Sequence, residues 1–415
     1  MSLLPTLIHA DGVILGDGAS LRDGAVVLSS DGEVIDVGES ASVVPRHAGA
    51  KVERVRGVVF PGLVNAHTHV EVSALRGSVP GGRGFIAWLD GFVGRRSEVD
   101  AEEDQTAIER AAEALDAFVT SAVGDVSNRL IAVHALARRG IGGSVFHEVF
   151  GSALEPLRSA VAALPHMLDE TVGNWPTRDL AYAVAPHALY TTHGSVVRDL
   201  VAAARDRGLP TSLHLAEHAP ERRALETEDG PLVDWLVARA RIPRAALTWP
   251  RLGPIAFADS LGALGPHVLS VHVTDARPEE IVLLAERAAS VVLCPRSNLH
   301  IEVRLPPFLP LRAAGVEAAL GTDSLASNAS LDVLAEARAL QDRFGATVSA
   351  REFVQMATWN GARALGRRDL GRIARGTRPG VGAVDGELGT EDPSAFLLRN
   401  VKSPRRWISR RRLEA

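Results

Sequence analysis

The stretch at residues 59–77, VFPGLVNAHTHVEVSALRG, decides how the rest of the chain is interpreted. The pair Pro61-Gly62 separates it from what comes before, and the apolar pair Leu63-Val64 begins a β-strand. Because side chains alternate along a strand, His67 and His69 point to the same face. A His-x-His pair at a strand end can bind a metal, but it also occurs without one. The interpretation therefore depends on whether the chain supplies further ligands.

Length and composition restrict the class of protein. A (β/α)8 barrel with small additions fits 415 residues as one catalytic unit. The net charge of −5 gives no reason to expect nucleic acid or an anionic membrane as a partner. The single cysteine, Cys294, cannot form an internal disulfide. With no signal-like first segment and no apolar run long enough to span a bilayer, we expect a cytoplasmic protein with a small-molecule substrate. A homodimer remains open.

The pattern of strands and helices predicts two domains. Residues 1–58 alternate short apolar runs with Asp-Gly turns, and the same style returns from residue 371 to 415. We expect these two segments to form one small β-sandwich domain. Residues 59–370 alternate apolar strands with helices, which is typical of βα units around a parallel sheet. Eight strands are expected, the number that closes a TIM barrel: Leu63–His69, Ala122–Ser127, Gly143–Val149, Ala181–Pro186, Thr211–Ala216, Val268–Val273, Ser290–Cys294 and Glu317–Gly321.

Two other segments carry expectations of their own. The segment Val79–Phe92 has three glycines beside Phe85 and Trp88, so it is expected to be a loop that either covers a pocket or lies on the surface. The C-terminal arginines are expected to form a solvated tail; they are Arg405, Arg406, Arg410, Arg411 and Arg412.

Further polar side chains follow other expected strands. His214 and Glu217 lie at the end of the fifth strand, His272 at the end of the sixth and Asp323 at the end of the eighth. Each alone is more often a capping or core residue. Together, inward histidines and an aspartate at the same end of a barrel provide the nitrogen and oxygen ligands that suit Zn²⁺ or Fe²⁺.

The motifs that contain these residues resemble those of the amidohydrolase superfamily, in its deaminase and chlorohydrolase branch. They occur in the family's order and span nearly the whole barrel: PGLVNAHTH at 61–69, Pro186-His187, HLAE at 214–217, His272, CPRSN at 294–298 and GTDS at 321–324. The resemblance implies a metal held by His67, His69, His214 and Asp323. It also implies a general acid and base at Glu217, a role for His272 beside the metal, and proton acceptance by Asp323.

The resemblance also bears on the number of metals. Relatives with two metals bridge them with a carboxylated lysine at the fourth strand. The only lysines here are Lys51 and Lys402, both outside the expected barrel. One divalent metal per chain is therefore expected, Zn²⁺ first and Fe²⁺ as the alternative.

The individual residues within these motifs resemble those of aminodeoxyfutalosine deaminases, which convert 6-amino-6-deoxyfutalosine to futalosine in menaquinone biosynthesis. The residues expected to bind substrate on this basis are His187, Glu71, Arg76, Glu148, Arg296 and Asn298. The sequence departs from common members at Val70 and Val72, where leucine is usual, and in having a single histidine on the sixth strand. These departures do not change the residues expected to carry out the reaction, but they leave the identity of the substrate open.

Other functions remain open at this point. The chain could act on adenosine, S-adenosylhomocysteine, guanine or cytosine, or could be a chlorohydrolase. An inactive metal-binding barrel is a third class, which Glu217 argues against because a barrel that only binds needs no proton shuttle.

Overall fold

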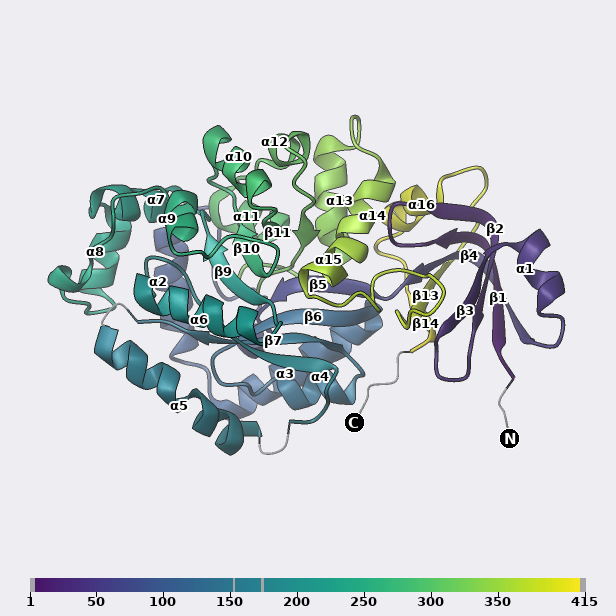
Figure 1. The fold of residues 1–415 in the computed structure, drawn as a ribbon, viewed down its shortest axis with the longest axis horizontal. Helices are drawn as coiled ribbons and strands as arrows, with labels where there is room; N and C mark the ends of the chain where they lie inside the picture. Colours follow the sequence, from purple (N-terminus) through teal and green to yellow (C-terminus); the bar gives the residue numbers. More distant parts are fainter. Residues whose placement is uncertain (1–3, 152–153, 173–174, 411–415) are drawn as a thin grey trace.

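The computed structural model describes residues 4–151, 154–172 and 175–410. Figure 1 shows an elongated molecule, with a β-sheet domain at one end and a larger α/β domain at the other. Among the described residues, no helix is long and apolar enough to cross a membrane.

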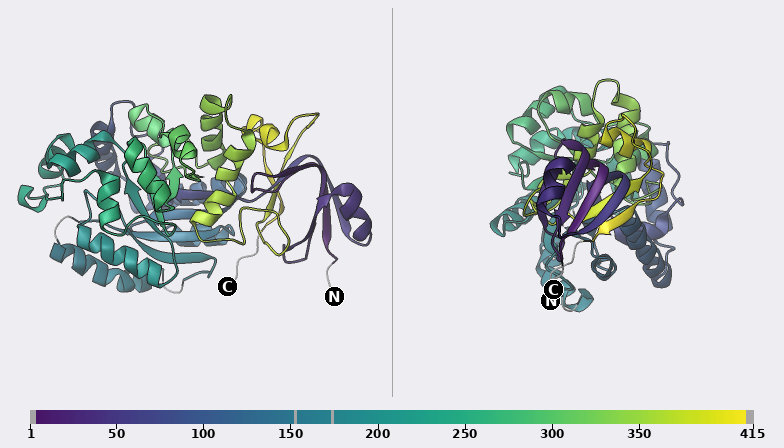
Figure 2. Two further views of the ribbon diagram at one scale, coloured as in Figure 1. Left: turned by 45° about the horizontal axis from the view of Figure 1, so that its top comes forward. Right: turned by 90° about the vertical axis from the view of Figure 1, so that its right-hand side faces the viewer.

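The smaller domain contains strands from both ends of the chain. Its six strands are β1 (Thr6–Ile14), β2 (Ser20–Leu28), β3 (Val34–Glu39), β4 (Lys51–Pro61), β13 (Val381–Asp385) and β14 (Arg406–Ser409). They form one sheet in the order β14-β13-β4-β1-β2-β3, seen face-on in the right-hand view of Figure 2. Helices α1 (Ser40–Arg46) and α16 (Pro393–Arg399) lie beside it.

The expected β-sandwich is not confirmed. The returning strand β13 pairs edge to edge with β4, antiparallel, with Val381 opposite Pro61 and Asp385 opposite Gly57. Hydrogen bonding at the open edge of β4 extends the existing sheet, whereas a sandwich needs a second sheet stacked on its face. Strand β4 also runs across the predicted domain boundary at residues 58 and 59.

The larger domain is of the TIM-barrel type. All eight expected strands are present: β5 (Leu63–Thr68), β6 (Thr120–Ser127), β7 (Gly142–Val149), β8 (Leu180–Pro186), β9 (Thr211–Leu215), β10 (Val268–His272), β11 (Ser290–Leu293) and β12 (Ala319–Leu320). They form two parallel four-stranded sheets, β5-β6-β7-β8 and β12-β11-β10-β9. Single parallel bridges, Thr68 with Asp323 and Ala188 with His214, join the two sheets on both sides. The strand ends that carry the predicted ligands are thus brought together.

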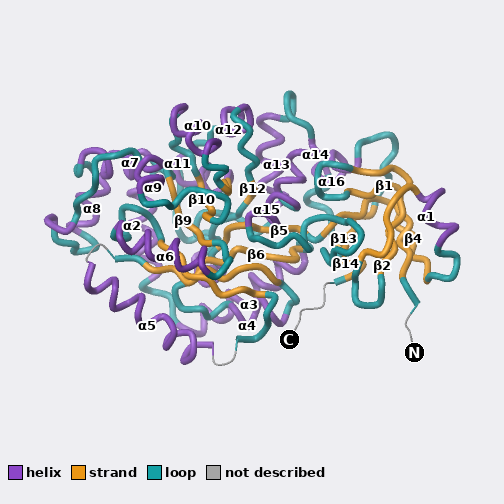
Figure 3. The backbone as a smooth tube through the Cα atoms, in the orientation of Figure 1, coloured by secondary structure: helices purple, strands orange, loops and turns teal. Residues whose placement is uncertain are grey.

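Helices cover the outside of these sheets (Figure 3). In Figure 1, α3, α4 and α5 lie along the lower side and α10, α12, α13 and α14 along the upper side. The helices of this domain are η1 (Val70–Leu75), α2 (Phe85–Arg96), α3 (Ala101–Ala117), α4 (Val133–Arg138), α5 (Leu154–Val172), α6 (Gly194–Asp206), α7 (Ala219–Thr227), α8 (Pro231–Ala238), η2 (Arg244–Ala246), α9 (Pro254–Ser260), α10 (Pro278–Glu286), α11 (Pro295–Glu302), α12 (Phe308–Ala313), α13 (Val333–Phe344), α14 (Ala350–Met356) and α15 (Trp359–Ala364).

The expectation of a loop over Val79–Phe92 was wrong in its second half, where α2 begins at Phe85. Phe85, Trp88, Leu89 and Phe92 recur at helical spacing and therefore place their apolar side chains on one side of a helix. Gly84, with φ of +84°, precedes the helix in a conformation that favours glycine.

The expectation of a solvated C-terminal tail was wrong for Arg405, whereas Arg406 and Arg410 have exposed side chains. The Arg405 side chain is 2% exposed and forms an ion pair with Asp332. Arg410 pairs with Asp116 at 2.5 Å, and Arg406 pairs with Asp385. Arg411 and Arg412 lie outside the described residues. The segment is held because acidic partners from distant parts of the chain face it, which the local composition cannot reveal.

Candidate metal centre and substrate cavity

Four predicted ligands converge at one end of the parallel strands. The Nε2 atoms of His67 and His69 lie 3.2 Å apart, and those of His69 and His214 lie 3.3 Å apart. Oδ1 of Asp323 lies 3.5 Å from Nε2 of His69 and 3.9 Å from Nε2 of His67. The sequence therefore identified four side chains that the fold brings within contact of one another.

This donor set fits a single divalent metal. Ligand atoms about 2.0–2.1 Å from a tetrahedral Zn²⁺ lie roughly 3.3 Å from one another, close to the three separations that involve His69, whereas the His67–Asp323 separation is longer. His214 has its Nδ1 2.9 Å from the carbonyl oxygen of His187. A ring that donates from Nδ1 leaves its Nε2 lone pair free for a metal. Burial lowers the pKa of His67 well below the usual value and that of His69 to about 3, so both rings are in the neutral form that binds metals.

Two serines orient the carboxylate of Asp323. The hydroxyls of Ser297 and Ser327 lie 2.6 and 2.8 Å from Oδ2, which turns Oδ1 toward the histidines. The backbone of Asp323 is left-handed, with φ of +56°. Its N–H donates to the carbonyl oxygen of His67 at 3.1 Å. A residue keeps a strained backbone of this kind only where the surrounding contacts hold it in place, and such residues are concentrated at functional sites.

Glu217 lies beside the metal ligands rather than among them. Its Oε1 is 3.6 Å from Nε2 of His272. Burial first, and then the charges of Asp323 and Glu221, raise the pKa of Glu217 well above its usual value. A carboxyl group that keeps its proton near neutral pH can act as a general acid. The backbone N–H of Glu217 donates to Oε2 of Glu221 at 2.8 Å, which holds the turn in place.

His272 is fully buried at the end of β10, where its backbone has φ of +73°. The side-chain amide nitrogen of Asn298 lies 3.3 Å from its Nδ1. Burial lowers the pKa of His272 to about 4, so the ring is neutral. Asn298, expected to touch substrate, lies behind His272 and does not line the cavity.

A cavity of about 850 Å³ opens over this cluster. Its floor contains His69, His214, Glu217, His272 and Asp323. The remaining wall is mainly apolar and aromatic, and it includes Phe85, Trp88, Leu89, Phe92, Phe150, Tyr190, Trp235 and Ile242. The chemistry of the lining suits a small molecule with one polar reacting end and an apolar or aromatic remainder.

Three of the residues expected to bind substrate line this cavity: His187, Glu71 and Glu148. The carboxylate of Glu71 accepts hydrogen bonds from the Ser127 hydroxyl at 2.6 Å and from the backbone N–H of Asn128 at 2.8 Å. Burial raises the pKa of Glu148 to about 7, and its Oε1 atom has no hydrogen-bond partner among the described residues. Glu148 is therefore the residue of this group best placed to accept a hydrogen bond from a ligand.

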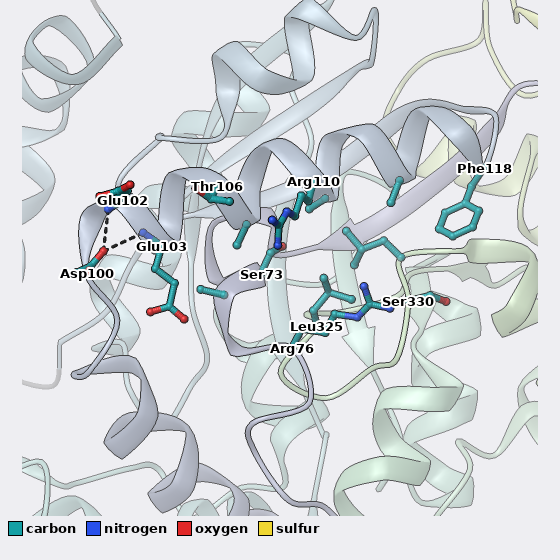
Figure 4. A pocket seen from close by; sticks show the side chains of 15 residues that line it. Ser73, Arg76, Asp100, Glu102, Glu103, Thr106, Arg110, Phe118, Leu325 and Ser330 are labelled. Carbon is teal, nitrogen blue, oxygen red and sulfur yellow. Dashed lines mark hydrogen bonds between the residues drawn. The ribbon is translucent and has the colours of Figure 1, made fainter.

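The structure places Arg76 and Arg296 elsewhere. Arg76 lines a separate pocket of about 590 Å³ between η1, α3 and the segment before α13, seen close up in Figure 4. Its guanidinium donates to the carbonyl oxygen of Ala329 at 3.1 Å. Arg296 donates to the Ser330 hydroxyl at 3.1 Å and does not line the cavity over the metal ligands.

The cavity contains cations that sequence reasoning missed, namely Arg96, Arg129 and Arg241. Arg96 and Arg129 both bind the carboxylate of Asp104, with Nη–Oδ2 distances of 3.0 and 2.7 Å. Arg129 lies two residues after the end of β6, where barrel enzymes carry functional side chains. Its position in the sequence could therefore have identified it as a residue of the cavity. Arg241 follows α8, and no pattern in the sequence indicated that this segment reaches the cavity.

The amidohydrolase family model matches residues 58–403. The chain belongs to the amidohydrolase family. The resemblance drawn from the motifs is confirmed, as is the expectation of a hydrolase of C–N bonds. The family is metal-dependent, in keeping with the cluster of histidines and the aspartate.

Similar curated proteins are nucleoside deaminases. The chain is 32% identical over 395 residues to 5-methylthioadenosine/S-adenosylhomocysteine deaminase of Halobacterium salinarum, covering 92% of this chain and 84% of that protein. It is 29% identical over 373 residues to aminodeoxyfutalosine deaminase of Deinococcus radiodurans, covering 87% and 86%.

Similar solved structures share the whole fold. Helicobacter pylori aminofutalosine deaminase in complex with methylthio-coformycin superposes with a TM-score of 0.85 at 24% identity, covering 99% of this chain and 100% of that one. An adenosine deaminase of Xanthomonas campestris with bound zinc gives a TM-score of 0.76 at 25% identity, covering 98% and 90%.

Proposed function

We propose that the protein is a hydrolytic deaminase that removes the 6-amino group of an adenine nucleoside. The observation that carries this proposal is the cluster of His67, His69, His214 and Asp323 beside the buried carboxyl of Glu217, with all of these residues except His67 lining one cavity. His67, His69, His214 and Asp323 would hold a divalent metal, which would supply Lewis-acid activation of water. Relatives named for deamination of adenine nucleosides agree with this chemistry.

Each protein group has a distinct part in the reaction. Asp323 takes a proton from the attacking water. Its pKa stays below the usual value despite its burial, so the carboxyl group is ionised and can accept that proton. Glu217 gives its proton to the ring nitrogen next to C6, which makes C6 electrophilic. His272 holds the attacking oxygen as the C6–O bond forms. The ionised Glu217 then takes the proton of the new C6 hydroxyl, and the proton held by Asp323 passes to the amino group, which leaves as ammonia while the ring becomes the 6-oxo form.

For the substrate itself we propose 6-amino-6-deoxyfutalosine, as in menaquinone biosynthesis. Its carboxylated aromatic substituent needs an aromatic wall and a cation. Phe85 and Trp88 supply the wall, with ring centroids 6.2 Å apart. Arg129 and Arg241 line the same cavity and supply the cations, whereas Arg76 does not.

A second candidate is 5-methylthioadenosine or S-adenosylhomocysteine. It is favoured by the relative from Halobacterium salinarum, which is 32% identical to the chain. The apolar part of the cavity also suits a methylthio group. Of these two nucleosides, 5-methylthioadenosine carries no carboxylate and needs no cation, whereas S-adenosylhomocysteine carries one on its aliphatic amino-acid end.

The test is a comparison of kcat/KM across purified substrates with the zinc-loaded enzyme. The panel contains 6-amino-6-deoxyfutalosine, 5-methylthioadenosine, S-adenosylhomocysteine, adenosine, guanine and cytosine, with ammonia release as the readout. We expect the first to be fastest and Arg241→Met to slow it more than it slows 5-methylthioadenosine. Faster release from guanine or cytosine than from every adenine nucleoside would overturn the proposal.

Two structural proposals accompany this function. We propose one metal per chain, because the barrel segment contains no lysine that could be carboxylated to bridge two ions. Metal analysis that finds two tightly bound ions per active chain would contradict it. We also propose that the eight strands form one closed barrel, supported by the bridges Thr68–Asp323 and Ala188–His214 on both sides of the two sheets.

A further inference from the structure

The residue directly after Glu217 has a buried polar atom that the mechanism above leaves unused. His218 is 1% exposed, and its Nε2 atom has no hydrogen-bond partner among the described residues. Buried polar groups in proteins are almost always paired, so an unpaired ring nitrogen beside a catalytic carboxyl calls for an explanation.

The hydrogen bond at the other ring nitrogen decides which atom carries the proton. Nδ1 of His218 accepts the backbone N–H of Glu221 at 3.0 Å and thereby caps α7. Burial lowers the pKa of His218 well below its usual value, so the ring is neutral and holds one proton. Because Nδ1 is an acceptor, that proton is on Nε2.

Stacking fixes the plane in which this donor points. The Phe85 ring lies over the His218 ring with centroids 3.4 Å apart and an interplanar angle of 23°. Tyr190 contacts the same ring, at a centroid distance of 5.8 Å. With its cap at one nitrogen and an aromatic ring on its face, His218 has little freedom to rotate.

The fixed donor lies next to one oxygen of the general acid. Nε2 of His218 is 3.9 Å from Oε2 of Glu217, while Nε2 of His272 is 3.6 Å from Oε1. The carboxyl group therefore lies between two ring nitrogens. A distance of 3.9 Å is too long for a hydrogen bond, but a small rotation of the Glu217 side chain closes it, and hydrogen bonds of catalytic groups often shorten only with substrate bound.

We infer that His218 is a positioning residue that donates from Nε2–H to Oε2 of Glu217 in the reacting complex. This hydrogen bond leaves the carboxyl proton on Oε1, the oxygen on the side of His272 and the metal ligands. The general acid then presents its proton toward the substrate ring in a single orientation. The inference deepens the proposed function and rests on it, because it needs Glu217 to be the proton donor.

Two variants of His218 separate this role from helix capping. His218→Asn keeps a side-chain oxygen near the position of Nδ1, so it retains the cap and loses the Nε2–H donor. His218→Gln places its amide nitrogen near the position of Nε2, so it retains the donor and loses the cap. Both replacements remove ring stacking on Phe85, which makes each a control for the other.

The expected results are opposite for the two variants. We expect kcat of His218→Asn to fall about 10- to 100-fold, as for loss of a hydrogen bond to an ionisable group, with KM nearly unchanged. His218→Gln retains kcat within about 5-fold of the wild-type enzyme. It melts about 1–2 °C lower than His218→Asn, because both variants lose the ring stacking and only His218→Gln also loses the cap. Equal losses of kcat in the two variants, in proportion to their loss of stability, would overturn the inference.

A second measurement does not depend on turnover. In protein labelled with ¹⁵N-histidine, the Nε2–H resonance of His218 is assigned by its absence in His218→Asn. Glu217→Ala removes the acceptor, so in the zinc-loaded protein saturated with an adenine nucleoside analogue we expect that resonance to move upfield. A resonance that does not respond to Glu217→Ala in this complex would refute the contact. If no adenine nucleoside is deaminated, the proposed function fails while this spectrum still tests the contact.

Discussion

The hydroxyls of Ser297 and Ser327 make a measurable contribution to metal affinity if the geometry around Asp323 is correct. They lie 2.6 and 2.8 Å from Oδ2 and leave Oδ1 facing His69 at 3.5 Å. Removing either one by substitution with alanine frees the carboxylate to rotate away from the histidines.

The size of the effect follows from the type of hydrogen bond. A hydrogen bond to a charged acceptor contributes about 1.5–3 kcal/mol, and groups that orient a metal ligand typically change metal affinity about 10- to 100-fold. We expect Ser297→Ala to raise the dissociation constant for Zn²⁺ about 10-fold. The double variant with Ser327→Ala should raise it about 100-fold, and by more than the product of the two single effects if the remaining hydroxyl compensates in each single variant.

The assay is competition for Zn²⁺ between the metal-free protein and a chromophoric chelator. Ser121→Ala is the matched control, because Ser121 is equally buried but donates to the carbonyl oxygen of Leu63 at 3.2 Å, where β6 begins. It should cost about 1 kcal/mol of stability without changing metal affinity. If Ser297→Ala bound Zn²⁺ as tightly as Ser121→Ala does, the serines would not set the orientation of Asp323.

Three further predictions concern separate parts of the molecule. Glu217→Gln should retain the metal and lose at least about 10²-fold in kcat, and near-normal turnover would reject Glu217 as the acid. Arg405→Met leaves Asp332 buried without its partner, so urea unfolding should show a loss of about 3–5 kcal/mol; a change below about 1 kcal/mol would mean that the pair is not essential. Burial alone would raise the pKa of Asp36, but hydrogen bonds from Arg46, His47 and Arg375 lower it below its usual value of 3.8. Its contribution to stability is therefore present above pH 4 and lost as the pH falls, so the difference in melting temperature between wild type and Asp36→Asn should shrink on acidification.

The sequence by itself determined the parallel α/β architecture and the main chemical groups. Alternating strands and helices predicted all eight parallel strands, because the period of apolar residues is a local property. His67, His69, His214 and Asp323 could be proposed as ligands because each directly follows or ends such a strand, and the carboxyl ends of parallel strands meet.

Only the tertiary structure decided which other side chains reach the cavity. Arg76 and Arg129 both follow a strand of the same sheet, yet Arg76 lines a different pocket because the chain turns through η1 before reaching it. Arg241 comes to the cavity from the segment after α8, and Arg405 finds Asp332 across 73 positions of sequence. These placements depend on how whole elements pack, and no local pattern records that. The tertiary structure also decided which ring nitrogen carries the proton at His214 and His218. In both residues Nδ1 is hydrogen-bonded to a backbone group, whose position depends on how the chain folds after a strand.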